Sequence, residues 1–217
     1  MIGLTTVRCP GDDRLIRDAT ELLSRDELDR HAKFINPEAR RAFAYRRAAR
    51  RLLLSRRVGI SPAALEVQEG DFIKPRVEGL SFNCSASGNF FLLAIAENSD
   101  IEVGADVETR RNVPELQMLV SDHMPELKNS ALLDAAVFLE AWTRKEAYLK
   151  ALGVGLSVEP SEVAIPLTNP CAFSSATDVR SFTIESFSDA TDYLVAVAYE
   201  GVRRPVVQTE LDFAALV

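Results

Sequence analysis

The apolar residues of the chain change twice from a helical spacing to alternation, and this order of patterns most constrains the fold. The patterns predict helices over residues 24–59, short strands over 80–109, a long helix over 129–152 and further strands over 182–200. Helices followed by strands are typical of an α+β fold. We therefore expect two α+β halves of similar size, residues 1–103 and residues 104–217.

Local signals support these elements. Ser24, with Glu27 three residues later, predicts a capping box at the start of a helix. Asn36 followed by Pro37 predicts the start of the next helix, because Asn caps well and Pro is favoured in the first turn. The run from Phe90 to Ala96 is apolar on both faces, so we expect it to form a central strand.

Charge is distributed unevenly along the chain. Residues 1–80 contain 16 Lys or Arg against 12 Asp or Glu, whereas residues 81–217 contain 9 against 20. Eight arginines lie between positions 40 and 57, which predicts a surface that attracts phosphate. A nucleic-acid binder could use these arginines, but the net charge of -7 and the lack of an aromatic stacking platform argue against it.

Several classes of protein are excluded by composition. No apolar run approaches the roughly 20 residues that a membrane span needs, and the first residues lack the apolar segment of a secretory signal. We therefore expect a cytoplasmic protein with no membrane partner. The three cysteines are far apart and lack CxxC spacing, so we expect neither a disulfide framework nor a zinc site.

Two acidic residues stand at the end of a predicted strand. Asp106 and Glu108 are two positions apart, so their side chains lie on the same face. Such carboxylates repel one another unless a cation lies between them. Gly104, just before them, permits another backbone or a ligand to come close. An acidic pair that faces water is an equally ordinary interpretation, so the pair alone does not establish a metal site.

The long predicted helix carries a second group of residues. Phe138, Trp142, Glu146 and Lys150 are each four positions apart, which places them on one helical face. In an isolated helix this pattern is best read as an apolar stripe ending in an exposed Glu–Lys pair, worth roughly a few tenths of a kcal/mol.

The two groups together carry a family resemblance. The segments VGADVE (103–108) and WTRKEAYLK (142–150) resemble the paired signature of the 4'-phosphopantetheinyl transferases, G-[IV]-D-[IV]-E followed by W-[ST]-x-K-E-[AS]-x-x-K. Residues 72–75 resemble the family's G-K-P turn, 82–88 its F-N-x-S-H-S-G strand and turn, 41–53 its basic helix, and 153–156 the segment after the helix motif. The chain length is similar to that of the single-chain, Sfp-type branch.

The resemblance implies a fold and an activity. The implied fold is α+β, with two similar α/β subdomains in a pseudo-twofold arrangement: residues 1–103 bind coenzyme A, and residues 104–217 carry the metal-binding and catalytic motifs. The implied enzyme is a monomer that transfers 4'-phosphopantetheine from coenzyme A to a serine of an acyl or peptidyl carrier protein. It requires Mg²⁺ and releases 3',5'-ADP.

The resemblance also implies roles for individual residues. Asp106, Glu108 and Glu146 match the family's three Mg²⁺ ligands, and Mg²⁺ prefers such oxygen ligands. Glu146 is the candidate acceptor of the serine proton, Lys150 matches the lysine that faces the diphosphate, and Glu146, Lys150 and Asp106 are the expected catalytic residues. The expected coenzyme A contacts are Arg41, Lys74, Pro75, Ser85, Lys145 and Lys150.

Three positions depart from the family pattern. Ala86 stands where the family usually has His, so a coenzyme A contact is lost or replaced there. Ile73 replaces a Gly and Ala105 replaces a bulkier residue, but neither change removes a charged group. Because of Ala86, one alternative is a catalytically weak relative that binds coenzyme A or carrier protein without efficient turnover. A generic Mg²⁺-dependent phosphohydrolase fits the acids but leaves the helix motif unexplained.

Overall fold

The computed structural model describes the whole chain except residues 71–72, 129, 131–132, 154–157, 176–177 and 189–191. Its helices are α1 (Ile16–Glu21), α2 (Arg25–Ala32), α3 (Pro37–Val58), α4 (Leu116–His123) and α5 (Ala135–Leu152). Its strands are β1 (Ile2–Arg8), β2 (Gln68–Gly70), β3 (Ile73–Arg76), β4 (Ser81–Ser87), β5 (Phe90–Ala96), β6 (Val103–Thr109), β7 (Cys171–Ser175), β8 (Asp178–Phe187), β9 (Tyr193–Glu200) and β10 (Val206–Asp212). Phe72 and residues 154–156, which contribute to the family resemblance, lie outside the described residues.

Two four-stranded sheets form the centre of the molecule. The first has the strand order β10-β1-β5-β4, and the second has the order β6-β9-β8-β7. Neighbouring strands are antiparallel except β1 and β10, which run parallel. β5 lies inside the first sheet and is buried along nearly all its length, which confirms the expected central strand.

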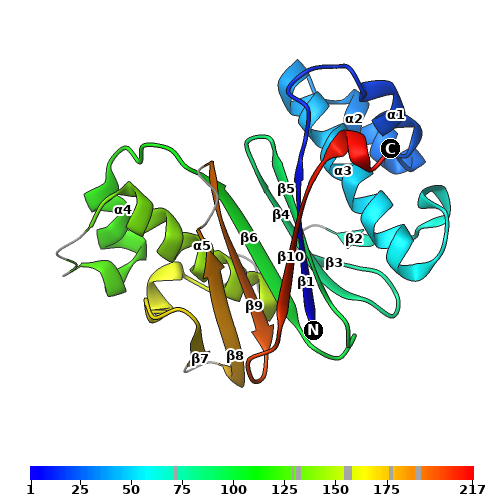
Figure 1. Cartoon of the computed structure of the whole chain (residues 1–217). Helices are drawn as coiled ribbons and strands as arrows, with labels where there is room; N and C mark the ends of the chain where they lie inside the picture. The colour runs from blue at the N-terminus through cyan, green and yellow to red at the C-terminus, as the bar shows by residue number, and fades with distance from the viewer. Residues whose placement is uncertain (71–72, 129, 131–132, 154–157, 176–177, 189–191) are drawn as a thin grey trace.

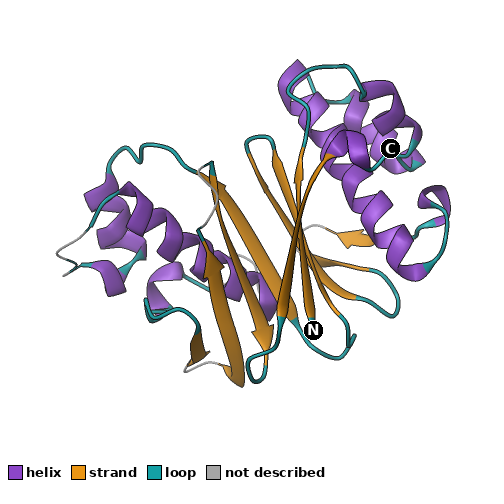
Figure 2. Cartoon of the chain, viewed as in Figure 1, coloured by secondary structure: helices purple, strands orange, loops and turns teal. Residues whose placement is uncertain are grey.

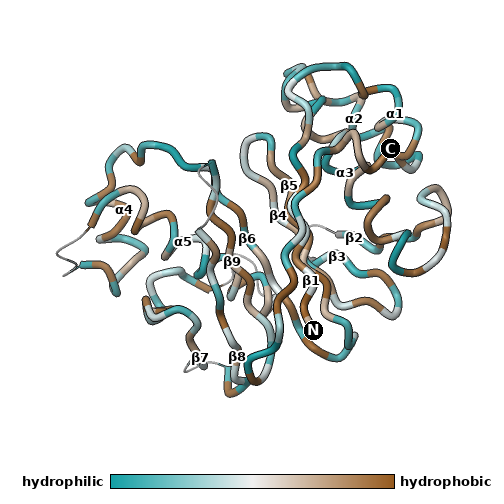
Figure 3. Tube along the Cα trace, in the orientation of Figure 1, coloured by the Kyte–Doolittle hydropathy of each residue, from teal (hydrophilic) through white to brown (hydrophobic). Residues whose placement is uncertain are grey.

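Helices cover the outer side of each sheet, as Figure 2 shows. Tyr45 of α3 shares an apolar core with Phe91 of β5, and Tyr148 of α5 shares one with Phe182 of β8. A third core lies between the two sheets and includes residues of β1, β5, β6 and β9. In Figure 3 the central strands are accordingly the more apolar part of the trace, whereas the outer loops are largely polar.

The last strand lies in the first sheet. β10, which belongs to the expected second half of the chain (residues 104–217), pairs in parallel with β1. Figure 1 shows these two strands, at opposite ends of the colour scale, side by side. Phe213 then packs its ring against Tyr45 of α3, with 4.9 Å between the ring centroids. Pairing with β10 leaves β1 inside the sheet rather than exposed at its edge.

The helix caps follow the sequence signals, with one change. Ser24 and Glu27 form the expected capping box, and the Asn36 side chain caps α3. α5 begins at Ala135 rather than at residue 129, because Asp134 accepts a hydrogen bond from the backbone of the first turn and so acts as its N-cap. No helix among the described residues is long and apolar enough to cross a membrane.

The arginine-rich segment is only partly a surface. Arg50 and Arg51 are buried, and both bind the buried carboxylate of Glu27, at 2.9 and 2.5 Å. Arg51 also donates to the carbonyl oxygens of Pro62 and Leu65. The expected attraction for phosphate therefore does not extend to these two positions, because their charges are already balanced inside the protein.

Gly104 brings α5 into direct contact with β6. A Cβ atom at position 104 would lie 2.1 Å from the carbonyl oxygen of Ala147 and 2.2 Å from the backbone nitrogen of Ala151. The close approach expected from this glycine is confirmed, and the approaching backbone is that of the helix. Residues of α5 and β6 around this contact therefore lie at a fixed separation.

We predict that Gly104→Ala disrupts this contact. The added methyl group meets backbone atoms that cannot rotate away, so the free energy of unfolding should fall by about 3 kcal/mol or more. Gly3→Ala is the matched control, since its Cβ would lie no closer than 3.9 Å to any atom outside its own neighbours. Urea denaturation should separate the two variants, and equal stability would contradict the contact.

We also predict that Glu27→Gln destabilises the protein. The change leaves the buried guanidinium groups of Arg50 and Arg51 without their shared countercharge, which typically costs about 3–5 kcal/mol. Asp29→Asn removes an exposed charge from the same helix and should change stability by less than about 0.5 kcal/mol. Thermal unfolding measured by circular dichroism would reveal the difference; similar melting temperatures would exclude a buried ionic role for Glu27.

Candidate active site

Side chains of β4 bind the edge of β6 where the two sheets meet. Asn83 Oδ1 accepts a hydrogen bond from the backbone N–H of Ala105 at 3.0 Å, and Ser87 Oγ accepts one from that of Thr109 at 3.1 Å. Asn83, Ser85 and Ser87 alternate along β4 and so share a face. This row of polar side chains forms the seam between the sheets, on which the candidate site lies.

Asp106 is at the centre of the site. Its side chain is buried, with only 4% of the residue exposed. Asp106 Oδ1 accepts a hydrogen bond from Ser85 Oγ at 2.6 Å and one from Lys150 Nζ at 2.5 Å. Lys150 Nζ also donates to Ser85 Oγ at 3.0 Å. The structure therefore brings together three residues from β4, β6 and the last turn of α5.

Two more carboxylates stand beside this cluster. Glu108 follows Asp106 on the same face of β6, and its Oε2 accepts a hydrogen bond from Ser87 Oγ at 2.9 Å. Glu146 lies one turn before Lys150 on α5. Burial, together with the negative charges of Asp106 and Glu108, raises the pKa of the Glu146 carboxyl, while the charge of Lys150 opposes this shift.

The chemistry of these carboxylates fits a divalent cation, although they do not form a closed ligand cluster. Among the described residues no group of three or more His, Cys, Asp or Glu lies close enough to hold a metal ion. The Lys150 ammonium instead neutralises Asp106. However, Asp106 Oδ2 is buried and has no hydrogen-bond partner. This carboxylate oxygen is therefore available to coordinate a cation. The three acids are oxygen donors, as Mg²⁺ prefers.

Lys145, which was expected near the diphosphate, does not join the Asp106 cluster. Its side chain is fully buried, and Nζ donates to the carbonyl oxygens of His123 and Pro160 at 2.8 and 2.9 Å. It also pairs with Glu126 at 3.0 Å. Adjacent helix positions point in directions about 100° apart, so Lys145 ties α5 to neighbouring turns while Glu146 faces the site.

Lys74 and Pro75 lie on β3, near the end of α5. Lys74 Nζ pairs with Glu102 at 2.6 Å, and burial lowers the pKa of its ammonium group. The Lys74 side chain reaches Gly153, the residue that caps α5. Lys74 therefore borders the same end of the helix as Lys150, but it does not join the Asp106 cluster.

Arg41 and Ala86 lie on the side of the seam nearer to α3. Arg41 pairs with Asp13 at 3.1 Å and lines a cavity of about 500 Å³ that also includes Arg46 and Gly88. Ala86 packs against the apolar core under α3. Because Ala86 alternates with Ser85 along β4, a side chain at this position faces away from Asp106.

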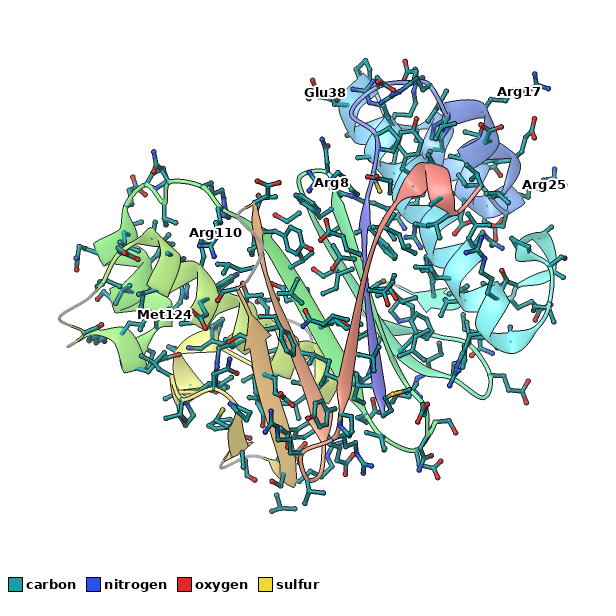
Figure 4. The ribbon with its side chains drawn as sticks, in the orientation of Figure 1. Arg8, Arg17, Arg25, Glu38, Arg110 and Met124 are labelled. Carbon is teal, nitrogen blue, oxygen red and sulfur yellow. The ribbon has the colours of Figure 1, made fainter. Side chains whose placement is uncertain are left out.

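A further cavity, of about 800 Å³, does not include the acidic cluster. It lies where β1 and β6 end and β5 begins, with Arg8, Phe90, Thr109 and Phe213 among its lining residues. Figure 4 shows Arg8 and Arg110, which follows β6, near this end of the molecule. We place the candidate site at the carboxylates rather than in this cavity, because the titratable groups converge there.

Sequence reasoning did not assign a role to Ser87 or to Asn83. A signal for them exists in the alternation of polar residues at positions 81, 83, 85 and 87 with the apolar residues Phe82, Cys84 and Ala86, which marks one polar face of the strand. That face could not be matched to β6 from the sequence, because the two strands come from different sheets.

Comparison with known proteins supports the family. Residues 102–198 match the model of the 4'-phosphopantetheinyl transferase superfamily. The chain is 32% identical over 174 residues to the 4'-phosphopantetheinyl transferase HetI of Nostoc sp., an alignment that covers 74% of this chain and 73% of HetI. It is 30% identical over 160 residues to slr0495 of Synechocystis sp., which is provisionally assigned the same activity; this covers 69% of this chain and 64% of slr0495.

The matched region contains the site described above. Asp106, Glu108, Glu146 and Lys150 all fall within residues 102–198, and Ser85 reaches them from the preceding sheet. The degree and extent of the similarity to HetI are sufficient to establish common ancestry. The chain therefore belongs to the 4'-phosphopantetheinyl transferase superfamily and is a transferase.

Proposed function

We propose that this enzyme transfers the 4'-phosphopantetheine group of coenzyme A to a serine hydroxyl of an acyl or peptidyl carrier protein. The serine oxygen forms a bond to the β-phosphorus, and the bond from that phosphorus to the bridging oxygen of the diphosphate breaks. The products are the phosphopantetheinylated carrier protein and 3',5'-ADP, which leaves with the electron pair of the broken bond.

One observation carries this proposal: Lys150, Ser85 and Asp106 are in mutual contact at the seam, with Glu108 and Glu146 beside them. An ammonium group among carboxylates, at the junction of two sheets, is suited to bind a diphosphate together with a divalent cation. No nucleophile of this chain is needed, because the attacking hydroxyl belongs to the partner.

The site residues then have distinct roles. Lys150 donates hydrogen bonds to the phosphate oxygens, where negative charge rises during transfer. Glu146 is the group proposed to accept the serine proton, because it lies beside Lys150 and Asp106 on the face of α5 that meets the seam. Asp106, Glu108 and Glu146 would hold Mg²⁺. When bound, this ion would neutralise charge on the diphosphate and the leaving group.

Coenzyme A is proposed to bind along the seam. Ser85 is next to the proposed diphosphate position, and Lys74, followed on β3 by Pro75, borders the end of α5. Arg41 is proposed to contact a more distant phosphate, because it lines a cavity that also holds Arg46. Lys145 is left out of this set, since its ammonium group is occupied elsewhere.

The architecture proposed for the chain is that of the Sfp-type branch. Each unit places a long helix, α3 or α5, on a four-stranded sheet, which is compatible with a pseudo-twofold arrangement of two subdomains. One chain supplies every residue of the candidate site, so a monomer without a nucleic-acid partner is proposed.

A second candidate is favoured by Ala86. The position lacks the imidazole that is usual in the family, so binding of coenzyme A without efficient turnover is the alternative. Binding of coenzyme A without labelling of any carrier protein would favour this alternative over the transferase.

We predict that the purified enzyme transfers a tagged phosphopantetheine from labelled coenzyme A to an apo-carrier protein when Mg²⁺ is present. Chelation should abolish the mass gain of the carrier, and added Mg²⁺ should restore it. Asp106→Asn and Glu146→Gln should each lower kcat/KM by about a hundredfold or more, since each removes a carboxylate proposed to hold the Mg²⁺ that would neutralise the diphosphate.

Asp122→Asn, which changes an exposed acid on α4, serves as the control and should label like the unaltered enzyme. Circular dichroism should show that both site variants remain folded. Full activity in Asp106→Asn and Glu146→Gln would overturn the site assignment.

The two lysines of the helix motif should behave differently. Lys150→Met should reduce kcat and cost less stability than the change at Lys145, because Lys150 is partly exposed although it neutralises the buried Asp106. Lys145→Met should lower the free energy of unfolding by about 3–5 kcal/mol, because it leaves the buried Glu126 and two carbonyl groups unpaired. Activity assays and urea denaturation of both variants test this difference. A stable but inactive Lys145→Met protein would show that Lys145 acts in the active site.

A further inference from the structure

Two serines of β4 match two acids of β6 in register. Ser85 donates to Asp106 Oδ1 at 2.6 Å, and Ser87 donates to Glu108 Oε2 at 2.9 Å. The two serines are two residues apart, and the two acids are also two residues apart. Because side chains alternate along both strands, the same face of each strand presents two equivalent Ser–acid pairs. Ser85 already has a proposed contact to phosphate, whereas Ser87 has no role in the mechanism above.

The hydrogen-bond donors around Ser87 determine where its proton lies. Ser87 Oγ accepts from the backbone N–H of Thr109 at 3.1 Å and lies 3.2 Å from Thr109 Oγ1. A hydroxyl group has one proton to donate, and an ionised carboxylate can only accept. The Ser87 proton therefore points to Glu108, and the Thr109 hydroxyl donates to Ser87.

Two side chains contact Glu108, and the hydrogen bond from Ser87 is the shorter of the two contacts. Arg111 reaches the same oxygen at 3.5 Å, and its side chain is 53% exposed, so this pair is weak. No described residue donates a hydrogen bond to Glu108 Oε1. Asp106 shows the same pattern, with one oxygen bound by a serine and the other without a partner.

We propose that Ser87 is a positioning residue, which fixes one oxygen of Glu108 and leaves the other available to a divalent cation. The inference rests on the proposed function, because it assigns Glu108 as a metal ligand. Asp106, Glu108 and Glu146 repel one another, and a carboxylate without such an anchor turns toward solvent and Arg111. The Ser87 hydroxyl keeps Glu108 beside the other two acids.

The test compares Ser87→Ala with Ser87→Thr, which restores a hydroxyl at the same carbon. Mn²⁺ is the probe, and its binding to the full chain is measured by loss of the free-ion signal in electron paramagnetic resonance. Ser87→Ala should weaken Mn²⁺ binding about tenfold, as is typical when an outer hydrogen-bond partner of a metal ligand is removed. Ser87→Thr should bind within about threefold of the unaltered protein.

Transfer to the carrier protein provides a second readout. Ser87→Ala should need about tenfold more Mg²⁺ for half-maximal labelling, while kcat at saturating Mg²⁺ changes little. Ser81→Ala is the matched control, because Ser81 lies on the same face of β4 but donates to the Ile101 carbonyl rather than to an acid. It should leave both Mn²⁺ binding and the Mg²⁺ requirement unchanged.

The outcomes separate this inference from the proposed function. Unaltered Mn²⁺ binding in Ser87→Ala, or an equal loss in Ser81→Ala, overturns the positioning role while transfer by the unaltered enzyme still stands. Failure of the unaltered protein to bind Mn²⁺ and to label a carrier protein overturns the proposed function itself. Weakened binding in Ser87→Ala alone, with recovery in Ser87→Thr, supports the positioning role.

Discussion

The backbone contact between α5 and β6 at Gly104 is the constraint on which the candidate site depends. Side chains usually separate a helix from the sheet on which it packs, but here the missing side chain lets the helix backbone touch the strand. Lys150 can then reach Asp106 from the last turn of α5. Asp106 lies two residues after this contact and is buried, and burial raises the pKa of Glu146.

Local patterns of the sequence predicted most elements and the residues that gather at the site. The spacing of Phe138, Trp142, Glu146 and Lys150 required one helical face, and alternation required Asp106 and Glu108 to share a strand face. Gly104 indicated a close approach, which the structure confirms. These features depend on neighbours within a few residues, so they can be read without knowing the fold.

Features set by distant residues could not be predicted in this way. Lys145 is next to Glu146 in the motif, but its direction on the helix and the turns that surround it decide its contacts. Likewise, nothing in the arginine-rich segment shows that Glu27 balances two of its charges inside the protein. The partners of the β4 serines depend on how the two sheets pack, since Ser87 and Glu108 belong to different sheets.

Because β10 pairs in the first sheet, that sheet is built from both ends of the chain, and the second sheet comes from the residues between them. A fragment that stops at residue 103 lacks both the strand beside β1 and the Phe213 ring against Tyr45. Exchange of subdomains between relatives by a single crossover would therefore produce mismatched sheets. A graft that keeps each sheet whole has to exchange the middle of the chain and leave both of its ends together.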